Sequence, residues 1–288
     1  MKLSLREQPP PDFSNSASSS GQSRDDQETG SAEMPISEDL PLRNNLNHAR
    51  EVIAEMVGTF ILMFCLTGNI ANTQLMSGEV GLMESAATTG LTIIVVIFCI
   101  GPISGAHINP ALTIAFATFC GFPWSKVPLY ILAQTVGFVF GAFVGKLVYG
   151  IKYDVMTTRP LQGCSSAFWV ELLATFIIFF LVASLTYEAP SIGNISGIVV
   201  GIVVGLAVFI TGPVSGGSMN PARSLGPAII SGNFKDIWIY ITAPIIGAVS
   251  GGLLYRFLRL RHSNSSQNTN QFSHSLMFLG VRAQDEHV

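Results

Sequence analysis

Gly101-Pro-Ile-Ser-Gly-Ala-His-Ile-Asn-Pro-Ala111 recurs in this chain as Gly212-Pro-Val-Ser-Gly-Gly-Ser-Met-Asn-Pro-Ala222. The two eleven-residue segments agree at seven positions, and each residue of the second lies 111 positions after its counterpart. Each ends in Asn-Pro-Ala, which predicts a helix start, because Asn is a favoured N-cap and Pro is tolerated at the first helical position. The repeat therefore predicts two equivalent helix starts. A duplicated polar loop also indicates a site, because packing alone rarely requires one.

The composition is that of an integral membrane protein. Of the 288 residues, 49% are hydrophobic and 11% are charged, and the mean hydropathy is +0.48, outside the usual soluble range. The net charge of -3 includes no basic cluster, so no nucleic-acid partner is expected. The four cysteines are widely spaced and predict neither a metal site nor a disulfide framework. No nucleophile with its base and no nucleotide loop is visible, so we expect no enzyme, no catalytic residue, no cofactor and no metal.

Apolar segments of two lengths organise the chain between polar tails, residues 1–48 and 261–288, which we expect to be disordered. A helix crosses a bilayer with about 20 residues. Six segments are long enough: residues 50–72, 82–101, 126–149, 166–187, 195–212 and 237–258. Two shorter ones, 109–119 and 220–230, follow Asn-Pro-Ala and are predicted to be re-entrant half-helices. Irregular backbone at that depth must be buried or line a wet cavity; a pair of interfacial loops is the alternative.

The repeat extends beyond the two loops. Glu55-Met-Val-Gly-Thr-Phe60 in the first span matches Glu171-Leu-Leu-Ala-Thr-Phe176 in the fourth. Each half of the membrane domain 49–260, residues 49–150 and 165–260, then holds three spans and one half-helix. Because three is odd, the second half enters the membrane from the opposite side. The predicted fold class is an all-α membrane protein with six transmembrane helices and two re-entrant half-helices in an inverted repeat. A modest Lys/Arg excess on the side of the tails predicts cytoplasmic termini.

Inverting the halves brings the two half-helix N-termini together near the midplane, where their dipoles oppose cations and protons. Within Asn109-Pro110-Ala111 and Asn220-Pro221-Ala222, each Asn can cap its helix through the carbonyl and offer amide N–H groups to a solute in a pore. Ordinary caps without solute contact are the alternative. Arg223 lies one turn after Asn220 in apolar sequence where a charge is costly, and its counterpart is Leu112. We expect it in the pore; a snorkelling arginine is the alternative.

Three further residues stand out in the apolar sequence. Glu55 and Glu171 occupy equivalent positions inside long spans, and we expect each carboxylate to accept hydrogen bonds that tether a re-entrant loop. A proton relay is the alternative, and it would need a titrating chain. His107 has Ser218 as its counterpart, so we expect it to line or gate a vestibule at the cytoplasmic end.

The two Asn-Pro-Ala loops, the Glu-x-x-x-Thr-Phe pairs and the Asn-Pro-Ala-Arg-Ser string ending at Ser224 together resemble the aquaporin (major intrinsic protein) family. The resemblance covers residues 50–258. Gly121-Phe-Pro-Trp-Ser125 and Gly216-Gly-Ser-Met-Asn-Pro-Ala-Arg-Ser-Leu-Gly-Pro227 look most like the plant nodulin-26-like intrinsic proteins, and within them the type 7 branch. The resemblance implies a channel that lies in the lipid bilayer, has small neutral solutes as its partners and assembles as a homotetramer. We expect it in the plasma membrane.

The family's selectivity filter carries over onto Thr89, Val208, Gly217 and Arg223. Water-selective members hold a large aromatic residue and a His at the corresponding positions, whereas this chain has small residues there. The resemblance therefore implies a wider constriction, passive passage of boric acid, glycerol, urea, arsenous acid and some water, and exclusion of ions and protons. Pro102 stands where many relatives have His, which bears on the anchoring of the first loop.

Other functions stay open at this point. The nearest alternative is a mainly water-selective channel, and the alternative of another class is a closed-pore membrane scaffold or junction protein. An ion-coupled carrier would need a titratable pair along the path. Ser263 and Ser265 follow three arginines in a context that suits a basophilic kinase, which makes them candidate phosphorylation sites.

Overall fold

The computed structural model describes residues 39–76, 81–187 and 195–259, and their regular structure is entirely helical. Apart from Asp39 and Leu40, these residues belong to one compact unit, Pro41–Val288. Six helices are long and apolar enough to cross a membrane, which confirms the predicted all-α membrane fold. The elements are α1 Asp39–Leu75, α2 Leu82–Ser104, α3 Pro110–Phe119, η1 Trp124–Lys126, α4 Val127–Tyr149, η2 Tyr153–Val155, α5 Cys164–Tyr187, α7 Ser196–Ser215, α8 Pro221–Ser231 and α9 Ile237–Leu258.

Several helix boundaries differ from the predicted ones. Helix α1 begins at Asp39, so residues 39–48, predicted as part of a disordered tail, belong to this helix. Helices α2 and α7 continue past the predicted ends at 101 and 212 to Ser104 and Ser215. Each contains a proline in its last turn, Pro102 or Pro213, where few hydrogen bonds remain to be broken. Ser263, Ser265 and the predicted tail 261–288 lie outside the described residues.

Equivalent glycines allow the first and third helix of each half to pack closely. A Cβ placed on Gly137 of α4 would lie 2.3 Å from the carbonyl oxygen of Met56 on α1. A Cβ on Gly247 of α9 would lie 2.2 Å from the carbonyl oxygen of Leu172 on α5. Both distances are far below van der Waals contact, so only glycine permits this approach. The small-residue packing common in membrane helices is thus duplicated with the repeat.

The second helix of each half crosses its counterpart at another glycine pair. A Cβ on Gly90 of α2 would lie 2.7 Å from the carbonyl oxygen of Gly201 on α7, and a Cβ on Gly201 would lie 2.6 Å from that of Gly90. The two residues occupy equivalent repeat positions, 111 apart. The near-identical reciprocal contact is what a pseudo-two-fold axis through this crossing produces.

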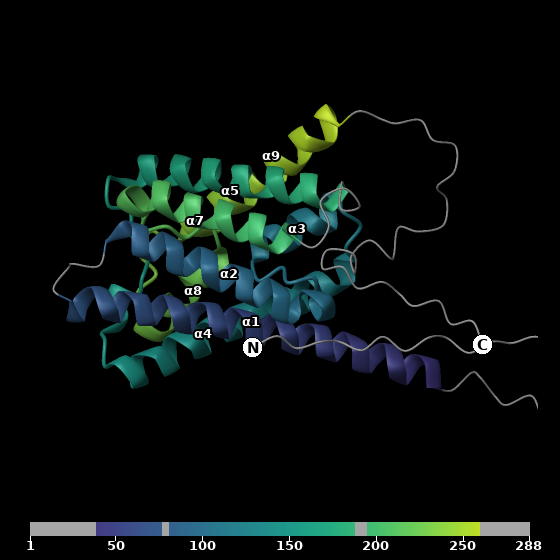
Figure 1. Ribbon diagram of the computed structural model, residues 1–288, viewed down its shortest axis with the longest axis horizontal. Helices are drawn as coiled ribbons and strands as arrows, with labels where there is room; N and C mark the ends of the chain where they lie inside the picture. Colours follow the sequence, from purple (N-terminus) through teal and green to yellow (C-terminus); the bar gives the residue numbers. More distant parts are fainter. Residues whose placement is uncertain (1–38, 77–80, 188–194, 260–288) are drawn as a thin grey trace, which may run out of the picture. The chain divides into compact units, whose positions relative to one another are not determined.

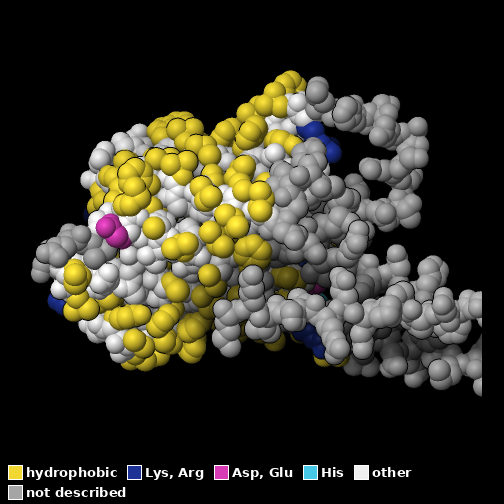
Figure 2. Space-filling view, viewed as in Figure 1, with side chains coloured by type: hydrophobic (Ala, Val, Ile, Leu, Met, Phe, Trp, Pro, Cys, Tyr) yellow, Lys and Arg dark blue, Asp and Glu magenta, His cyan; other side chains and the backbone are white. Residues whose placement is uncertain are grey.

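The two short helices fill the space between the long ones. Helix α3 packs on α9 and α4, and α8 packs on α4 and α9, so each half-helix contacts both halves of the repeat. Helices α3 and α8 also contact one another, and Figure 1 shows both of them among the long helices. Hydrophobic side chains cover much of the outer face in Figure 2, and the charged side chains visible there lie toward its two ends. The fold therefore presents an apolar belt to lipid and holds two half-helix starts inside.

Candidate pore and filter

A buried carboxylate anchors the first re-entrant loop. Glu55 of α1 is fully buried, and its Oε1 accepts hydrogen bonds from Ser104 Oγ at 2.7 Å and from the backbone N–H of His107 at 2.9 Å. Its Oε2 accepts one from the backbone N–H of Ile108 at 2.7 Å. An unmade bond to any of these buried donors would cost about 1–3 kcal/mol. The loop is therefore held by a side chain from a different helix. These contacts are present with Pro102 at the position where many relatives have His.

The second loop has the same anchor. Glu171 of α5 is fully buried, and its Oε1 accepts hydrogen bonds from Ser215 Oγ at 2.5 Å and from the backbone N–H of Ser218 at 2.9 Å. Its Oε2 accepts one from the backbone N–H of Met219 at 2.5 Å. Every donor is the repeat counterpart of a donor to Glu55. Each carboxylate accepts three hydrogen bonds from its loop, which favours the tether over a proton relay.

Ile108 and Met219, whose backbone N–H groups bond the two carboxylates, have a strained backbone that directs each carbonyl toward the opposite loop. Ile108 has φ 44 and Met219 has φ 51, in the left-handed region that a β-branched residue such as Ile rarely enters. Strain of this kind costs on the order of 1–3 kcal/mol. The carbonyl of Ile108 accepts a hydrogen bond from Asn220 Nδ2 at 2.8 Å, and that of Met219 accepts one from Asn109 Nδ2 at 2.9 Å. The strained conformations thus join the two loops reciprocally.

Both asparagines also cap their half-helices. Asn109 Oδ1 accepts a hydrogen bond from the backbone N–H of Ala111 at 2.9 Å, and Asn220 Oδ1 accepts one from that of Ala222 at 3.0 Å. The sequence predicts that the amide N–H groups face a solute, but one N–H of each amide instead bonds the opposite loop. An amide has two N–H donors, so one remains on each side chain. Repeat counting could not show this bond, because its acceptors are backbone carbonyls.

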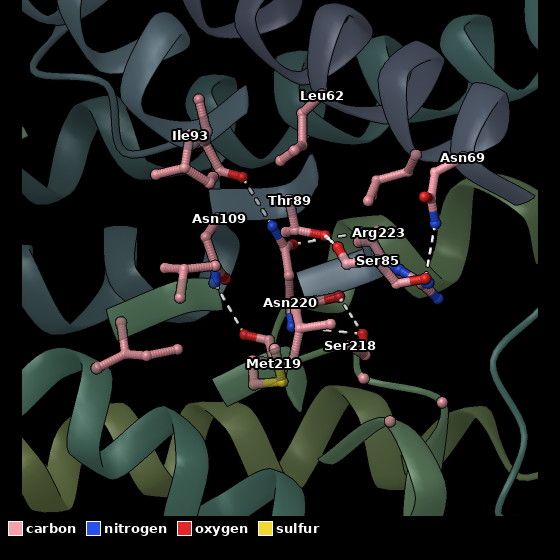
Figure 3. A pocket seen from close by; sticks show the side chains of 18 of the residues that line it. Leu62, Asn69, Ser85, Thr89, Ile93, Asn109, Ser218, Met219, Asn220 and Arg223 are labelled. Carbon is pink, nitrogen blue, oxygen red and sulfur yellow. Dashed lines mark hydrogen bonds between the residues drawn. The ribbon is translucent and has the colours of Figure 1, made fainter. Parts of the chain in front are cut away.

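A cavity of about 360 Å³ lies beside the contact between the two loops and is lined by residues of both. Asn109 and Asn220 lie on its wall together with all four residues of the expected filter, Thr89, Val208, Gly217 and Arg223. Figure 3 shows Thr89, Asn220 and Arg223 gathered around this space. Pro110, Ala111, Pro221 and Ala222 are instead buried in the first turns of α3 and α8. The structure therefore brings together the residues that sequence counting grouped.

The filter residues offer different chemistry to the cavity. Arg223 lies on the cavity wall, so its guanidinium brings a cationic donor to the cavity, and its buried Nη1 has no hydrogen-bond partner among the described residues. Thr89 Oγ1 donates its proton to the backbone carbonyl of Ser85 at 2.8 Å, which leaves an acceptor oxygen. Val208 adds a buried apolar wall, and Gly217, at φ 67, adds backbone and no side chain. No aromatic ring belongs to this set.

His107 also lies on the cavity wall and is packed against aromatic rings. Its ring centroid is 4.4 Å from that of Phe116, 4.6 Å from that of Phe122 and 5.3 Å from that of Tyr130. Only 3% of the residue is exposed, although it contributes to the cavity wall. No group of three or more His, Cys, Asp or Glu residues in the described part of the chain could hold a metal ion. His107 is thus a fixed part of the wall in this structure.

Sequence reasoning missed several polar residues of the loop anchor and the cavity wall. Gln134 is fully buried and its Nε2 donates to Glu55 Oε2 at 2.7 Å, whereas Asn69 and Ser85 line the cavity near Arg223. An amide side chain within a predicted span was the available signal for Asn69 and Gln134. Met156, which is also on the wall, comes from the connection between α4 and α5, and its sequence gives no such signal.

Six membrane-length helices, an inverted repeat and a lined cavity where two half-helices meet define a polytopic protein of the channel and transporter class. The sequence model of the family described as "Major intrinsic protein" matches residues 43–255. The chain belongs to the major intrinsic protein family, as the motifs predict. It is therefore an aquaporin-type membrane channel and not an enzyme.

Known proteins refine this assignment. The chain is 55% identical over 224 residues to "Probable aquaporin NIP7-1" of Arabidopsis thaliana, covering 77% of this chain and 81% of that protein. It is 42% identical over 226 residues to "Aquaporin NIP6-1" of the same plant, covering 78% and 74%. The X-ray structure of the aquaglyceroporin from Plasmodium falciparum matches with a TM-score of 0.63 and 27% identity, covering 73% of this chain and 96% of that one. The chain is thus of the plant nodulin-26-like (NIP) type.

Proposed function

We propose that this protein is a passive channel for small uncharged solutes, among them boric acid, glycerol, urea and arsenous acid, with some water. The observation that carries the proposal is the set of residues around Arg223. Thr89, Val208 and Gly217 share the cavity wall with this arginine, and none of them brings a ring or a long side chain. A wall of this kind leaves room for a solute larger than water.

The donors and acceptors of the wall suit a neutral hydroxylated solute. The guanidinium of Arg223 and the second N–H of each asparagine amide donate, whereas the oxygen of Thr89 accepts. A hydroxyl both donates and accepts, so a solute with several hydroxyls can replace the water contacts that it loses on entry. Boric acid and glycerol have this chemistry.

The same wall opposes ions. The N-termini of α3 and α8 each carry about half a positive charge from aligned peptide dipoles, and they meet at the two asparagines. Arg223 adds a full positive charge one turn further along the cavity. Cations and protons therefore meet an electrostatic barrier, and anions meet an apolar wall with too few donors to replace their hydration.

Orientation and assembly belong to the proposal. We place both termini in the cytoplasm of a plasma-membrane protein, and we propose the homotetramer implied by the family. Support for the orientation comes from the distribution of Lys and Arg: Arg43, Arg50, Lys126, Arg256, Arg259 and Arg261 lie on the side of the tails, against Lys146, Lys152, Arg159 and Lys235 on the other.

Stopped-flow light scattering on vesicles that contain the purified protein tests the proposal. Boric acid and glycerol should enter much faster than into empty vesicles. The variant Thr89→Phe should lower both permeabilities about tenfold or more, because a ring would occupy the wall opposite Arg223. Thr242→Phe, at an exposed position of α9, is the matched control. High water flux without entry of boric acid or glycerol would instead support a water-selective channel, and no flux at all would support a scaffold.

A further inference from the structure

A pair of polar side chains lies beside the filter and belongs to none of its four positions. Asn69 of α1 donates a hydrogen bond from Nδ2 to Ser85 Oγ of α2 at 2.7 Å. Figure 3 shows the two side chains extending toward one another next to Arg223. Both residues contribute to the cavity wall. Ser85 precedes Thr89 by four residues, so the two lie one helical turn apart on the same face of α2.

The hydroxyl proton of Ser85 is available to a solute. Ser85 Oγ accepts from Asn69, and its backbone carbonyl accepts the hydroxyl proton of Thr89. Within the described ranges, no hydrogen bond is donated by Ser85 Oγ to a protein group. A hydroxyl that already accepts a hydrogen bond is also a stronger donor, because neighbouring hydrogen bonds polarise one another. Asn69 therefore orients Ser85 as a donor.

The pair complements the filter rather than duplicating it. The hydroxyl of Thr89 donates its proton to a backbone carbonyl, so its oxygen is an acceptor for a solute. The hydroxyl of Ser85 accepts a hydrogen bond from Asn69, so its proton is a donor for a solute. The guanidinium of Arg223, from α8 and on the same cavity wall, adds the second donor. A solute at this level therefore meets two donors and one acceptor from α2 and α8. This pattern matches a molecule with several hydroxyls better than it matches a single water molecule.

We propose that Asn69 and Ser85 extend the filter by one turn into a subsite for small polyhydroxy solutes such as boric acid and glycerol. Ser85 contacts the solute, and Asn69 is a positioning residue that acts through it. The inference rests on the proposed function, because it assigns part of the solute selection to this pair. Water loses fewer hydrogen bonds on entry, so it depends less on the subsite.

The full-length protein in vesicles provides the test, with boric acid, glycerol and water permeability measured on the same preparations. Ser85→Ala should lower boric acid and glycerol permeability about two- to tenfold, the effect of one lost hydrogen bond, and change water permeability less than twofold. Ser85→Thr keeps the hydroxyl and should retain most of the solute flux. Ser250→Ala, whose hydroxyl bonds the carbonyl of Ile246 on the exposed side of α9, is the matched control.

A double variant separates positioning from simple structural support. Asn69→Ala should lower solute flux less than Ser85→Ala, and the double variant should equal Ser85→Ala, because Asn69 acts only through the serine. An unchanged ratio of solute to water permeability in Ser85→Ala would overturn the subsite. The channel proposal would still stand in that case if boric acid entered through the unmodified protein. Failure of the unmodified protein to conduct boric acid and glycerol would overturn both proposals.

Discussion

The two halves of the molecule share one scaffold and differ in the side chains around the cavity. Glu55 and Glu171 hold equivalent loops through equivalent donors. Where the first half has Leu112, however, the second has Arg223, so at this repeat position the second half adds a charge to the wall and the first does not. The comparison teaches that symmetry builds the central contact, whereas the departures from symmetry supply the chemistry that distinguishes solutes.

The largest expected effect comes from breaking one symmetric anchor. Glu171→Ala removes the acceptor of Ser215 Oγ and of two backbone N–H groups in the second loop. Each unpaired donor costs about 1–3 kcal/mol. With three donors unpaired, we expect the free energy of unfolding to fall by about 3 kcal/mol or more. Thermal unfolding in detergent should show a lower Tm and vesicles should lose all flux. Glu55→Ala should behave alike, and a tolerated Glu55→Ala would end the claim of equivalent anchors.

The glycine crossing predicts two losses of stability of unequal size. Gly90→Ala pushes a methyl group against the carbonyl oxygen of Gly201 at 2.7 Å. Gly201→Ala pushes one against the carbonyl oxygen of Gly90 at 2.6 Å and also against Cγ1 of Ile94 at 2.3 Å. We expect each to destabilise the fold by about 1–3 kcal/mol, as for overpacked cores, with the larger loss for Gly201→Ala. Denaturation monitored by circular dichroism measures both, with Ser250→Ala as the reference. An unchanged stability in either variant would show that α2 and α7 do not approach this closely.

Replacing the one charged departure makes the halves more alike. Arg223→Leu copies the residue of the first half and removes the guanidinium from the cavity wall. We expect the ratio of boric acid to water permeability to fall about tenfold, near the value of a charge-assisted hydrogen bond, and the proton leak to rise. Parallel flux and pH-dye assays measure these, and Lys235→Leu, at an exposed site, is the control. An unchanged ratio would remove Arg223 from solute selection.

The smallest effect should come from Gln134, a residue that differs between the two halves and that supports the structure without lining the cavity. Gln134 of α4 donates to Glu55 Oε2 at 2.7 Å and to Thr113 Oγ1 at 3.0 Å, and its counterpart in α9 is Pro244. Gln134→Leu should therefore lower stability by about 1 kcal/mol, because the second half folds without such a donor. The Tm should fall while the ratio of solute to water flux stays constant. A changed ratio would assign Gln134 to the pore.

The repeated sequence predicted the spans, the half-helices and their caps because each depends on local patterns. Matching the halves also located Glu55 and Glu171, since two acidic residues inside apolar spans are rare. It could not locate the acceptors of the asparagine amides, which are backbone carbonyls of Ile108 and Met219 and have no residue-type signature. Nor could it place Met156 on the cavity wall, because a connection between helices carries no periodicity that fixes its direction.

The reciprocal bonds from Asn109 to Met219 and from Asn220 to Ile108 have a mechanical consequence. Because each bond joins one half to the other at the level of the two helix starts, widening the passage there would pull the halves apart and leave four strong polar groups unpaired. The middle of the passage therefore behaves as a fixed aperture. We therefore expect any control of permeation to act away from this central joint.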